Sequence, residues 1–163
     1  MAVPTAKAIP SPLFWQVSST GFDRVPAQQA EAKGIEIKRV YLDSKGNPVQ
    51  NVNQGEELTV KITARAMKPR IENCVISDLL PGGFEMVIPR DNEAQNLPAG
   101  VKHTNRREDR MLIFADLTNQ PLTFTYRIRA VNRGLFPVPP IQAEAMYDQS
   151  LYGHGASESV EVR

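Results

Sequence analysis

Few side chains in this sequence have the type and spacing needed for catalysis or for metal binding. His103 and His154 are far apart, and neither has a second histidine at the spacing of a ligand pair. The stretch at 155–159, GASES, lacks the second glycine of a nucleophile elbow. No glycine-rich loop ends in the Gly-Lys-Ser/Thr that cradles phosphates. We therefore expect no enzyme activity, no metal site and no cofactor, with both histidines solvated in loops.

Cys74 is the one cysteine of the chain, so no disulfide can form within it. It lies between Asn73 and Val75 in a segment that we expect to be a strand. Burial among apolar side chains disfavours the thiolate that a nucleophile needs. We therefore expect Cys74 to pack in the core, and a nucleophilic role is the alternative.

Glu144 and Asp148 are two carboxylates that could be imagined as an acid/base pair. In a strand, residues four apart lie roughly 13 Å from one another. That separation exceeds the one typical of glycosidase carboxylates. We interpret both as polar residues of a strand edge.

The charge pattern argues against nucleic acid as a partner. The formal net charge is +1, with acidic and basic residues interspersed. The basic stretch Lys102–Arg107 is followed at once by Glu108 and Asp109, and no aromatic residue lies within it to stack on a base. We expect this stretch to be a solvated hairpin or loop. No apolar run reaches the ~20 residues that a membrane-spanning helix needs.

The elements that must position these side chains are short strands. Apolar and polar residues alternate strictly in Glu57–Ala66 and in Leu122–Val131. Such alternation is typical of strands with one face on a core and the other in water, as in antiparallel sandwiches. Further strands are expected at Leu13–Ser19, Gly34–Leu42, Ile71–Asp78, Phe84–Ile88, Arg110–Leu117, Ile141–Met146 and Ser157–Val162. The sequence therefore predicts an all-β protein with the fold of an antiparallel β-sandwich.

The remaining segments set the expected boundaries. Residues 1–12, rich in Ala and Pro, predict a flexible N-terminal segment or linker, and 13–163 predict a single domain. The first four residues have neither the basic start nor the apolar core of a secretory signal. Gln28–Lys33 could form one helical turn, Pro89–Arg107 is expected to be a long connection, and Trp15 is expected in the core.

The most informative stretch is Pro137–Asp148, PVPPIQAEAMYD, where three prolines precede a short alternating segment. The prolines fix φ and remove three backbone donors, which excludes a helix and favours an extended path at a sheet edge. The alternation places Ile141, Ala143, Ala145 and Tyr147 on one face and Gln142, Glu144 and Met146 on the other. A large apolar Met at the end of a polar face indicates a surface that something else covers.

Two positions of Met146 remain open from the residues alone, an interface and the core. A bulge after Ala145 would turn Met146 inward, where Met fills irregular gaps well. Tyr147 could equally be a core ring whose hydroxyl reaches solvent.

The chain resembles the C-terminal, macroglobulin-like domain of bacterial alpha-2-macroglobulins, which are large periplasmic protease traps. The similarity includes FADLTNQPLTFTYRIRAVNRGLFPVPPIQAEAMYDQSLYGHGAS, which ends at Ser157, and its PPIQAEAMYD block is the most specific part. VYLDSKGNPV at Val40–Val49, GEELTVKITARA at Gly55–Ala66 and ISDLLPGGFE at Ile76–Glu85 are also similar, in the order of the family. Together these blocks cover most of residues 34–163.

The resemblance implies a module of a larger inhibitor. In the family, a protease cuts a bait region in another domain, and a thioester then tethers the protease. The thioester joins a Cys and a Gln in a Cys-x-Glu-Gln motif, and Cys74-Val75-Ile76-Ser77 has no such Gln. This chain therefore does not contain the reactive group.

The resemblance further implies that the module packs on the thioester domain and keeps water and small amines from the bond. Met146 is the expected covering residue, and Tyr147, Glu144, Gln142 and Asp148 would share the contact. The expected partners are the other domains of the parent protein and, through the parent, target proteases, in the periplasm. The isolated chain is expected to be a monomer.

The alternative is a free-standing adhesin-like sandwich, or one that binds carbohydrate or protein. Such a protein would need a site of its own, such as exposed aromatic residues or a calcium loop. Trp15 is the one tryptophan and lies in a predicted strand, and no Asp-rich loop is visible.

Overall fold

Strict alternation in β4 (Glu57–Ala66) and β9 (Leu122–Ala130) builds the centre of the first main sheet. Every second side chain of each strand is buried, and the two strands pair antiparallel. β2 (Ile35–Leu42) and β6 (Phe84–Met86) flank them, in the order β2-β4-β9-β6. The computed structural model describes residues 16–18, 27–88 and 97–163, and within these it contains strands and no helix.

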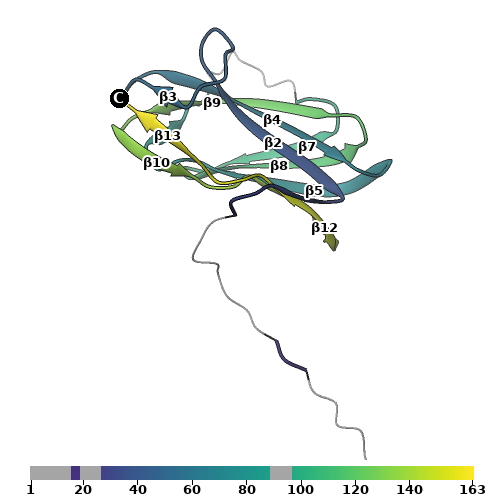
Figure 1. Ribbon diagram of the computed structural model, residues 1–163. Helices are drawn as coiled ribbons and strands as arrows, with labels where there is room; N and C mark the ends of the chain where they lie inside the picture. Colours follow the sequence, from purple (N-terminus) through teal and green to yellow (C-terminus); the bar gives the residue numbers. More distant parts are fainter. Residues whose placement is uncertain (1–15, 19–26, 89–96) are drawn as a thin grey trace, which may run out of the picture.

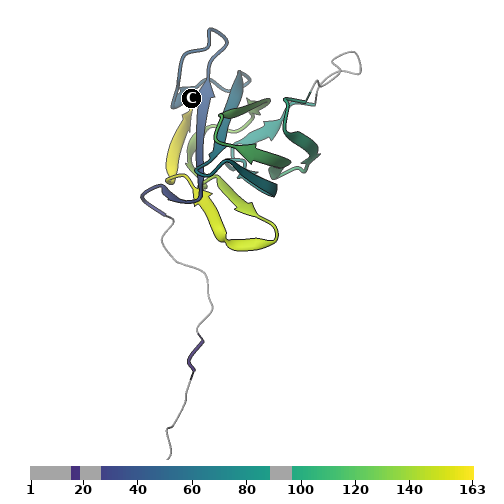
Figure 2. The ribbon, with the colours of Figure 1, turned by 90° about the vertical axis from the view of Figure 1, so that its right-hand side faces the viewer.

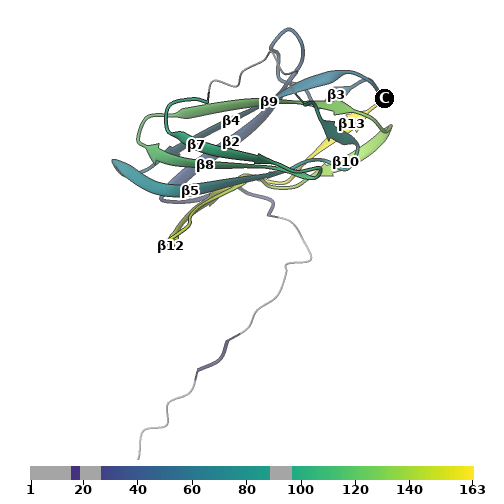
Figure 3. The ribbon, with the colours of Figure 1, turned by 180° about the vertical axis from the view of Figure 1, so that it is seen from behind.

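A six-stranded antiparallel sheet forms the second layer of the sandwich (Figure 1). Its order is β1 (Glu31–Lys33), β12 (Asp148–His154), β11 (Gln142–Ala145), β5 (Arg70–Leu79), β8 (Arg110–Thr118) and β7 (Val101–Arg106). β10 (Gly134–Val138), β13 (Glu158–Val162) and β3 (Asn51–Val52) form a small third sheet. Figures 1 and 3 show this sheet at the end of the sandwich opposite β12. The prediction of an all-β, antiparallel sandwich is confirmed.

The core lies between the two main sheets. Ile62 and Ile128 from the first sheet and Ile76 and Ile113 from the second are almost completely buried. Burial of such side chains stabilises the fold by roughly 1.5–3 kcal/mol each. The strands predicted from alternation therefore meet face to face.

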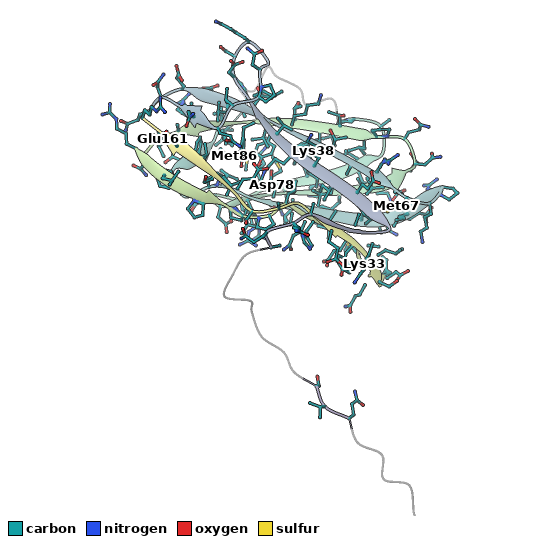
Figure 4. The ribbon with its side chains drawn as sticks, viewed as in Figure 1. Lys33, Lys38, Met67, Asp78, Met86 and Glu161 are labelled. Carbon is teal, nitrogen blue, oxygen red and sulfur yellow. The ribbon has the colours of Figure 1, made fainter. Side chains whose placement is uncertain are left out.

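A buried ion pair joins the layers. Asp78 on β5 is fully buried and accepts hydrogen bonds from the Arg39 guanidinium and from the Tyr126 hydroxyl, the latter at 2.7 Å. Arg39 Nη2 also donates to the Pro139 carbonyl at 2.7 Å, and the guanidinium lies 5.3 Å from the centre of the Tyr41 ring. Figure 4 shows Asp78 between the sheets. Strands β2, β5 and β9 and the proline-rich segment are thereby fixed to one another.

Several sequence-based expectations differ from the structure. Residues 16–18 are exposed and not in a strand, and the rest of the predicted Leu13–Ser19 strand, with Trp15, lies outside the described residues. Lys33 and its neighbours form β1, because pairing with β12 satisfies backbone groups that a single helical turn leaves open. The predicted long connection Pro89–Arg107 contains β7, which pairs with β8.

The two histidines lie in strands instead of loops. His103 is in β7 and stacks on Phe114, with ring centres 5.9 Å apart. His154 ends β12 with its Nε2 3.4 Å from the Glu31 carboxylate. Among the described residues there is no helix long and apolar enough to cross a membrane.

Candidate functional site

The predicted site lies at the tip of the hairpin formed by β11 and β12, where Met146 and Tyr147 form the connecting turn. Pairing runs regularly to Glu144 opposite Tyr152 and then shifts, so that Ala145 lies opposite Asp148. On its other side β11 pairs with β5. Figure 2 shows the hairpin projecting from the body of the sandwich. We call Met146 and Tyr147 the apolar tip.

Exposure along β11 follows the predicted alternation up to the turn. Gln142 and Glu144 are exposed, whereas Ala143 and Ala145 are buried. Met146 follows on the outer side with 48 % of its surface exposed. The core position of Met146, which the residues left open, is therefore not the one observed.

Tyr147 is 84 % exposed, so its predicted inward direction is wrong. Alternation holds only while the chain stays extended. The strand ends at Ala145, and both turn residues then project from the hairpin. Two large apolar side chains thus lie next to each other in solvent.

The apolar tip is attached to β5 through Asn73. The Met146 backbone N–H donates to the Asn73 carbonyl at 2.9 Å. Asn73 has a φ of 54°, in the left-handed region that Asn tolerates better than most residues. The pairing of β5 with β8 shifts register between Ile71 and Cys74, so Asn73 sits in a bulge. The bulge aims the Asn73 carbonyl at the turn.

Asp116 on β8 holds this bulge in place. Its carboxylate accepts the Asn73 backbone N–H at 2.9 Å and lies 2.6 Å from Lys102 Nζ and 2.8 Å from Arg70 Nη2. Lys102, the Asn73 N–H and Arg70 lower the pKa of Asp116 to about 2. The carboxylate is therefore charged at neutral pH and keeps three donors around Asn73.

Asp148 closes the base of the turn. Its carboxylate accepts the Ser150 hydroxyl at 2.6 Å and the Ser150 backbone N–H at 3.1 Å, and these bonds lower its pKa. Lys68, in the connection between β4 and β5, adds a further attraction. Its neighbour Met67 is 58 % exposed, and Figure 4 shows it at the end of the sandwich from which the hairpin projects. The apolar tip thus has polar groups and a second exposed Met nearby.

No catalytic arrangement accompanies the tip in the described part of the chain. Cys74 is buried, burial raises the pKa of its thiol to about 11, and Sγ lies 3.6 Å from the Ile71 carbonyl. The expectation that it packs in the core is confirmed. No group of three or more His, Cys, Asp or Glu side chains in residues 16–18, 27–88 and 97–163 is placed to hold a metal ion. What the geometry offers is a contact surface.

Comparison with known proteins shows the family to which the chain belongs. Residues 34–150 match the family of the bacterial alpha-2-macroglobulin MG10 domain. This chain belongs to the bacterial alpha-2-macroglobulin family. It is 37 % identical over 158 residues to the alpha-2-macroglobulin of Rickettsia conorii and 35 % identical over 154 residues to that of Pasteurella multocida. These matches cover 91 % and 93 % of the chain and 8 % of each relative, so the chain spans less than a tenth of their length.

Solved macroglobulin structures share the fold. The native conformation of the Escherichia coli alpha-2-macroglobulin matches with a TM-score of 0.75 and 26 % identity, over 88 % of this chain and 10 % of that one. A structure of the same protein from domain MG7 to the C-terminus gives 0.73 and 26 %, over 85 % and 25 %. Related structures are of the Salmonella protein reacted with methylamine and of the Escherichia coli protein activated by porcine elastase. The macroglobulin fold expected from the resemblance is confirmed.

Sequence reasoning missed the residues that hold the tip. Asp116 is the one acidic residue of β8, and that is the signal that could have marked it, whereas Asn73 lies in a strand with several other polar residues and has no such signal. Nothing in the local pattern of either strand shows that the two meet. The pairing of β5 with β8 brings them together.

Proposed function

We propose that this chain is the C-terminal module of a periplasmic, broad-range protease-trapping inhibitor, and that its apolar tip packs on the thioester domain of the parent protein. There the tip shields the reactive bond before a protease cuts the bait region. Membership of the macroglobulin family supports the module. The observation that carries the shielding role is the exposure of Met146 and Tyr147 side by side on a projecting turn.

The physical basis of the shielding is the exclusion of nucleophiles. A thioester is attacked by water or amines that approach its carbonyl, and an apolar side chain over the carbonyl blocks that approach and removes solvent. The attachment of Met146 to Asn73 limits the motion of the turn. A cover that is already ordered loses little conformational entropy on contact. These features suit the tip to a contact that must stay closed until cleavage.

The polar residues around the tip suit the rim of such a contact. Gln142, Glu144 and Asp148 are exposed on the same hairpin. Interfaces between protein domains commonly surround an apolar centre with polar, solvated residues. In this arrangement Met146 and Tyr147 form the centre, and the three polar side chains set the orientation of the module.

The decisive experiment measures the inactivation of a thioester-bearing parent by methylamine before any protease is added. Met146→Ala and Tyr147→Ala should each speed inactivation, because a small amine gains a path to the bond. Leu135→Ala is the matched control, since Leu135 is also exposed, at 71 %, but lies on β10 at the opposite end (Figure 1). Unchanged rates in both tip variants would contradict the shielding role.

A second test concerns the isolated chain, which should have no inhibitory activity of its own. Incubation with a trypsin-class protease should leave cleavage of large substrates unchanged, because the chain carries no Cys-x-Glu-Gln motif. Stoichiometric inhibition would contradict the role of a single module. Membership of the family favours this function over a free-standing adhesin-like or carbohydrate-binding sandwich.

A further inference from the structure

Arg106 points into the sandwich from an edge strand. It ends β7, the outermost strand of the six-stranded sheet on the side away from β12. Arg106 lies opposite Met111 of β8, which is fully buried. Directly opposed residues of an antiparallel pair share a face of the sheet. The Arg106 side chain is therefore directed toward the facing sheet.

The guanidinium of Arg106 has no acceptor among the described residues. Its Nε and Nη2 atoms are both buried and make no hydrogen bond. Burial lowers the pKa of Arg106, and no carboxylate among the described residues acts against this effect. A buried charge-bearing donor without an acceptor costs free energy, and such groups are rare in folded proteins.

An open pocket of about 550 Å³ lies beside this guanidinium. Its walls come from the two sheet edges, with Met86 of β6 and Ile88 on one side and the Arg106–Glu108 segment on the other. Ile88 is 80 % exposed. Glu85 also lines the pocket, but it lies on the outer side of β6, where Phe84 before it is buried and Glu85 is exposed. The pocket thus combines two apolar side chains, Met86 and Ile88, with a buried guanidinium, and the charged side chains of Glu85, Arg107 and Glu108 at its mouth are exposed and make no hydrogen bond to that guanidinium.

Protection of the edge is the simpler explanation for an inward charge on an edge strand, because such a charge discourages pairing with other chains. A charge that only protects the edge can stay solvated, because long basic side chains normally keep their head groups in water. In Arg106 two of the nitrogens are withdrawn from water instead. The burial points to an acceptor that the described residues do not supply.

We propose that this pocket is a docking site for the carboxylate of an Asp or Glu side chain from another domain of the parent macroglobulin. Nε and Nη2 form one side of the guanidinium fork, and this side matches a carboxylate with two parallel hydrogen bonds. An apolar residue next to the incoming carboxylate covers Ile88. An inorganic anion would not use that apolar contact. The relatives are more than ten times longer than this chain, so other domains are available to supply the carboxylate.

A binding experiment on this chain tests the chemistry. The probe is N-acetyl-L-aspartate, followed through the Nε–Hε NMR signal of Arg106, with N-acetyl-L-asparagine at equal ionic strength as the neutral control. The aspartate probe should shift the signal saturably in the millimolar range, and the asparagine probe should not. Arg106→Lys keeps the charge but loses the fork and its Nε signal, so in this variant the backbone amide signals of residues 84–88 and 104–108 should respond equally to the two probes. Arg107→Lys, an exposed neighbour, should bind as the original chain does. Equal responses of the original chain to the two probes would overturn the proposal.

Hydrogen exchange in the parent protein tests whether another domain covers the pocket. Segments 84–88 and 104–108 should exchange more slowly in the parent than in the isolated chain. Arg106→Lys in the parent should raise their exchange rates by about tenfold or more, as expected for loss of a local closed state. Arg107→Lys is the control. Equal exchange in the parent and in the isolated chain would overturn the proposal.

Asp91 and Glu93 of this chain are the competing source of a carboxylate. If the isolated chain carrying Asp91→Asn and Glu93→Gln gains binding of the aspartate probe, the acceptor is internal and the proposal is wrong. The docking site is independent of the shielding role, because β7 and β12 lie toward opposite edges of the six-stranded sheet. Methylamine inactivation of the parent should therefore be unaffected by Arg106→Lys, which separates failure of one proposal from failure of the other.

Discussion

Arg39 and Arg106 both point into the sandwich, but the described residues provide partners for only the first. Arg39 meets the Asp78 carboxylate and the Pro139 carbonyl and lies over the ring of Tyr41. The two buried nitrogens of Arg106 meet no acceptor among the described residues. A buried guanidinium is tolerated at Arg39 because strands from both layers surround it. At the open edge beside β6 and β7, the described residues offer Arg106 no such surroundings.

Asp116 and the apolar tip differ in the same way, because Asp116 has partners within the domain and the tip is exposed. Asp116 has three donors on β5 and β7, so its charge is compensated inside the fold. Met146 and Tyr147 remain half and largely exposed, respectively, among the described residues. Arg39 lies between the layers and Asp116 lies on the outer face of β8, whereas the uncompensated groups lie at a sheet edge and at a hairpin tip. In a module of a larger protein, we expect the second kind to mark the contacts with other domains.

The largest effect is expected when the compensated pair is broken. Arg39→Met should lower the free energy of unfolding by roughly 3–5 kcal/mol, because it leaves the Asp78 carboxylate buried without its cation. Chemical denaturation of the isolated chain measures this. The control is Arg39→Met combined with Asp78→Leu, which removes both charges and should recover most of the loss. A single variant as stable as the original chain would show that the pair is not what holds the layers.

How far the sequence predicts the fold depends on how far each strand alternates. β4 and β9 were located correctly because one face of each meets the core and the other meets water. β7 and β12 are rich in polar residues, and their burial depends on neighbouring strands and not on their own pattern. Their positions follow from pairing across the sheet, which a local pattern does not contain.

The site was predictable up to the point where the strand ends. The alternation gave the outward direction of Gln142, Glu144 and Met146 correctly. It failed at Tyr147, because the turn begins at Met146 without the Asn-Gly or Asp-Gly pair that usually marks a two-residue hairpin. Arg106 was missed because it lies in a basic stretch that suggests a solvated surface, and its inward direction follows only from pairing with Met111.

A second compensated group can be tested by pH. Lys102, the Asn73 N–H and Arg70 hold the pKa of Asp116 at about 2, below its ordinary value of 3.8. The charged carboxylate therefore adds stability that is fully present above pH 3.8 and is lost as the pH falls toward 2. Asp116→Asn should make the unfolding free energy less dependent on pH in this window. Asp109→Asn, an exposed carboxylate beside Arg110, should change it less, because solvent screens that pair. Equal pH profiles for Asp116→Asn and the original chain would contradict the role of the carboxylate.

The uncompensated arginine should respond in the opposite direction from Arg39. Arg106→Met removes two buried donors without an acceptor and leaves no unpaired charge behind. We expect the free energy of unfolding of the isolated chain to stay the same or to rise by about 1 kcal/mol. One denaturation assay thus compares the change in unfolding free energy when Met replaces an arginine that has acceptors, Arg39, and one that has none among the described residues, Arg106. A loss of several kcal/mol at Arg106 would show that the chain itself supplies a partner, and the docking proposal would fail.

The smallest effect is expected at the apolar tip. Met146→Ala should change the free energy of unfolding of the isolated chain by about 0.5 kcal/mol or less, because an exposed side chain away from special features contributes little. Met111→Ala is the matched control, since Met111 is fully buried and its truncation should cost roughly 2–5 kcal/mol. The backbone bond from Met146 to Asn73 does not depend on the side chain, so the turn should persist in the variant. A loss at Met146 close to that at Met111 would mean that the side chain packs on the body of this domain in solution. It would then have no free surface to offer a thioester domain. A small loss, together with faster inactivation of the parent by methylamine, would instead place the contribution of this Met in the contact between domains.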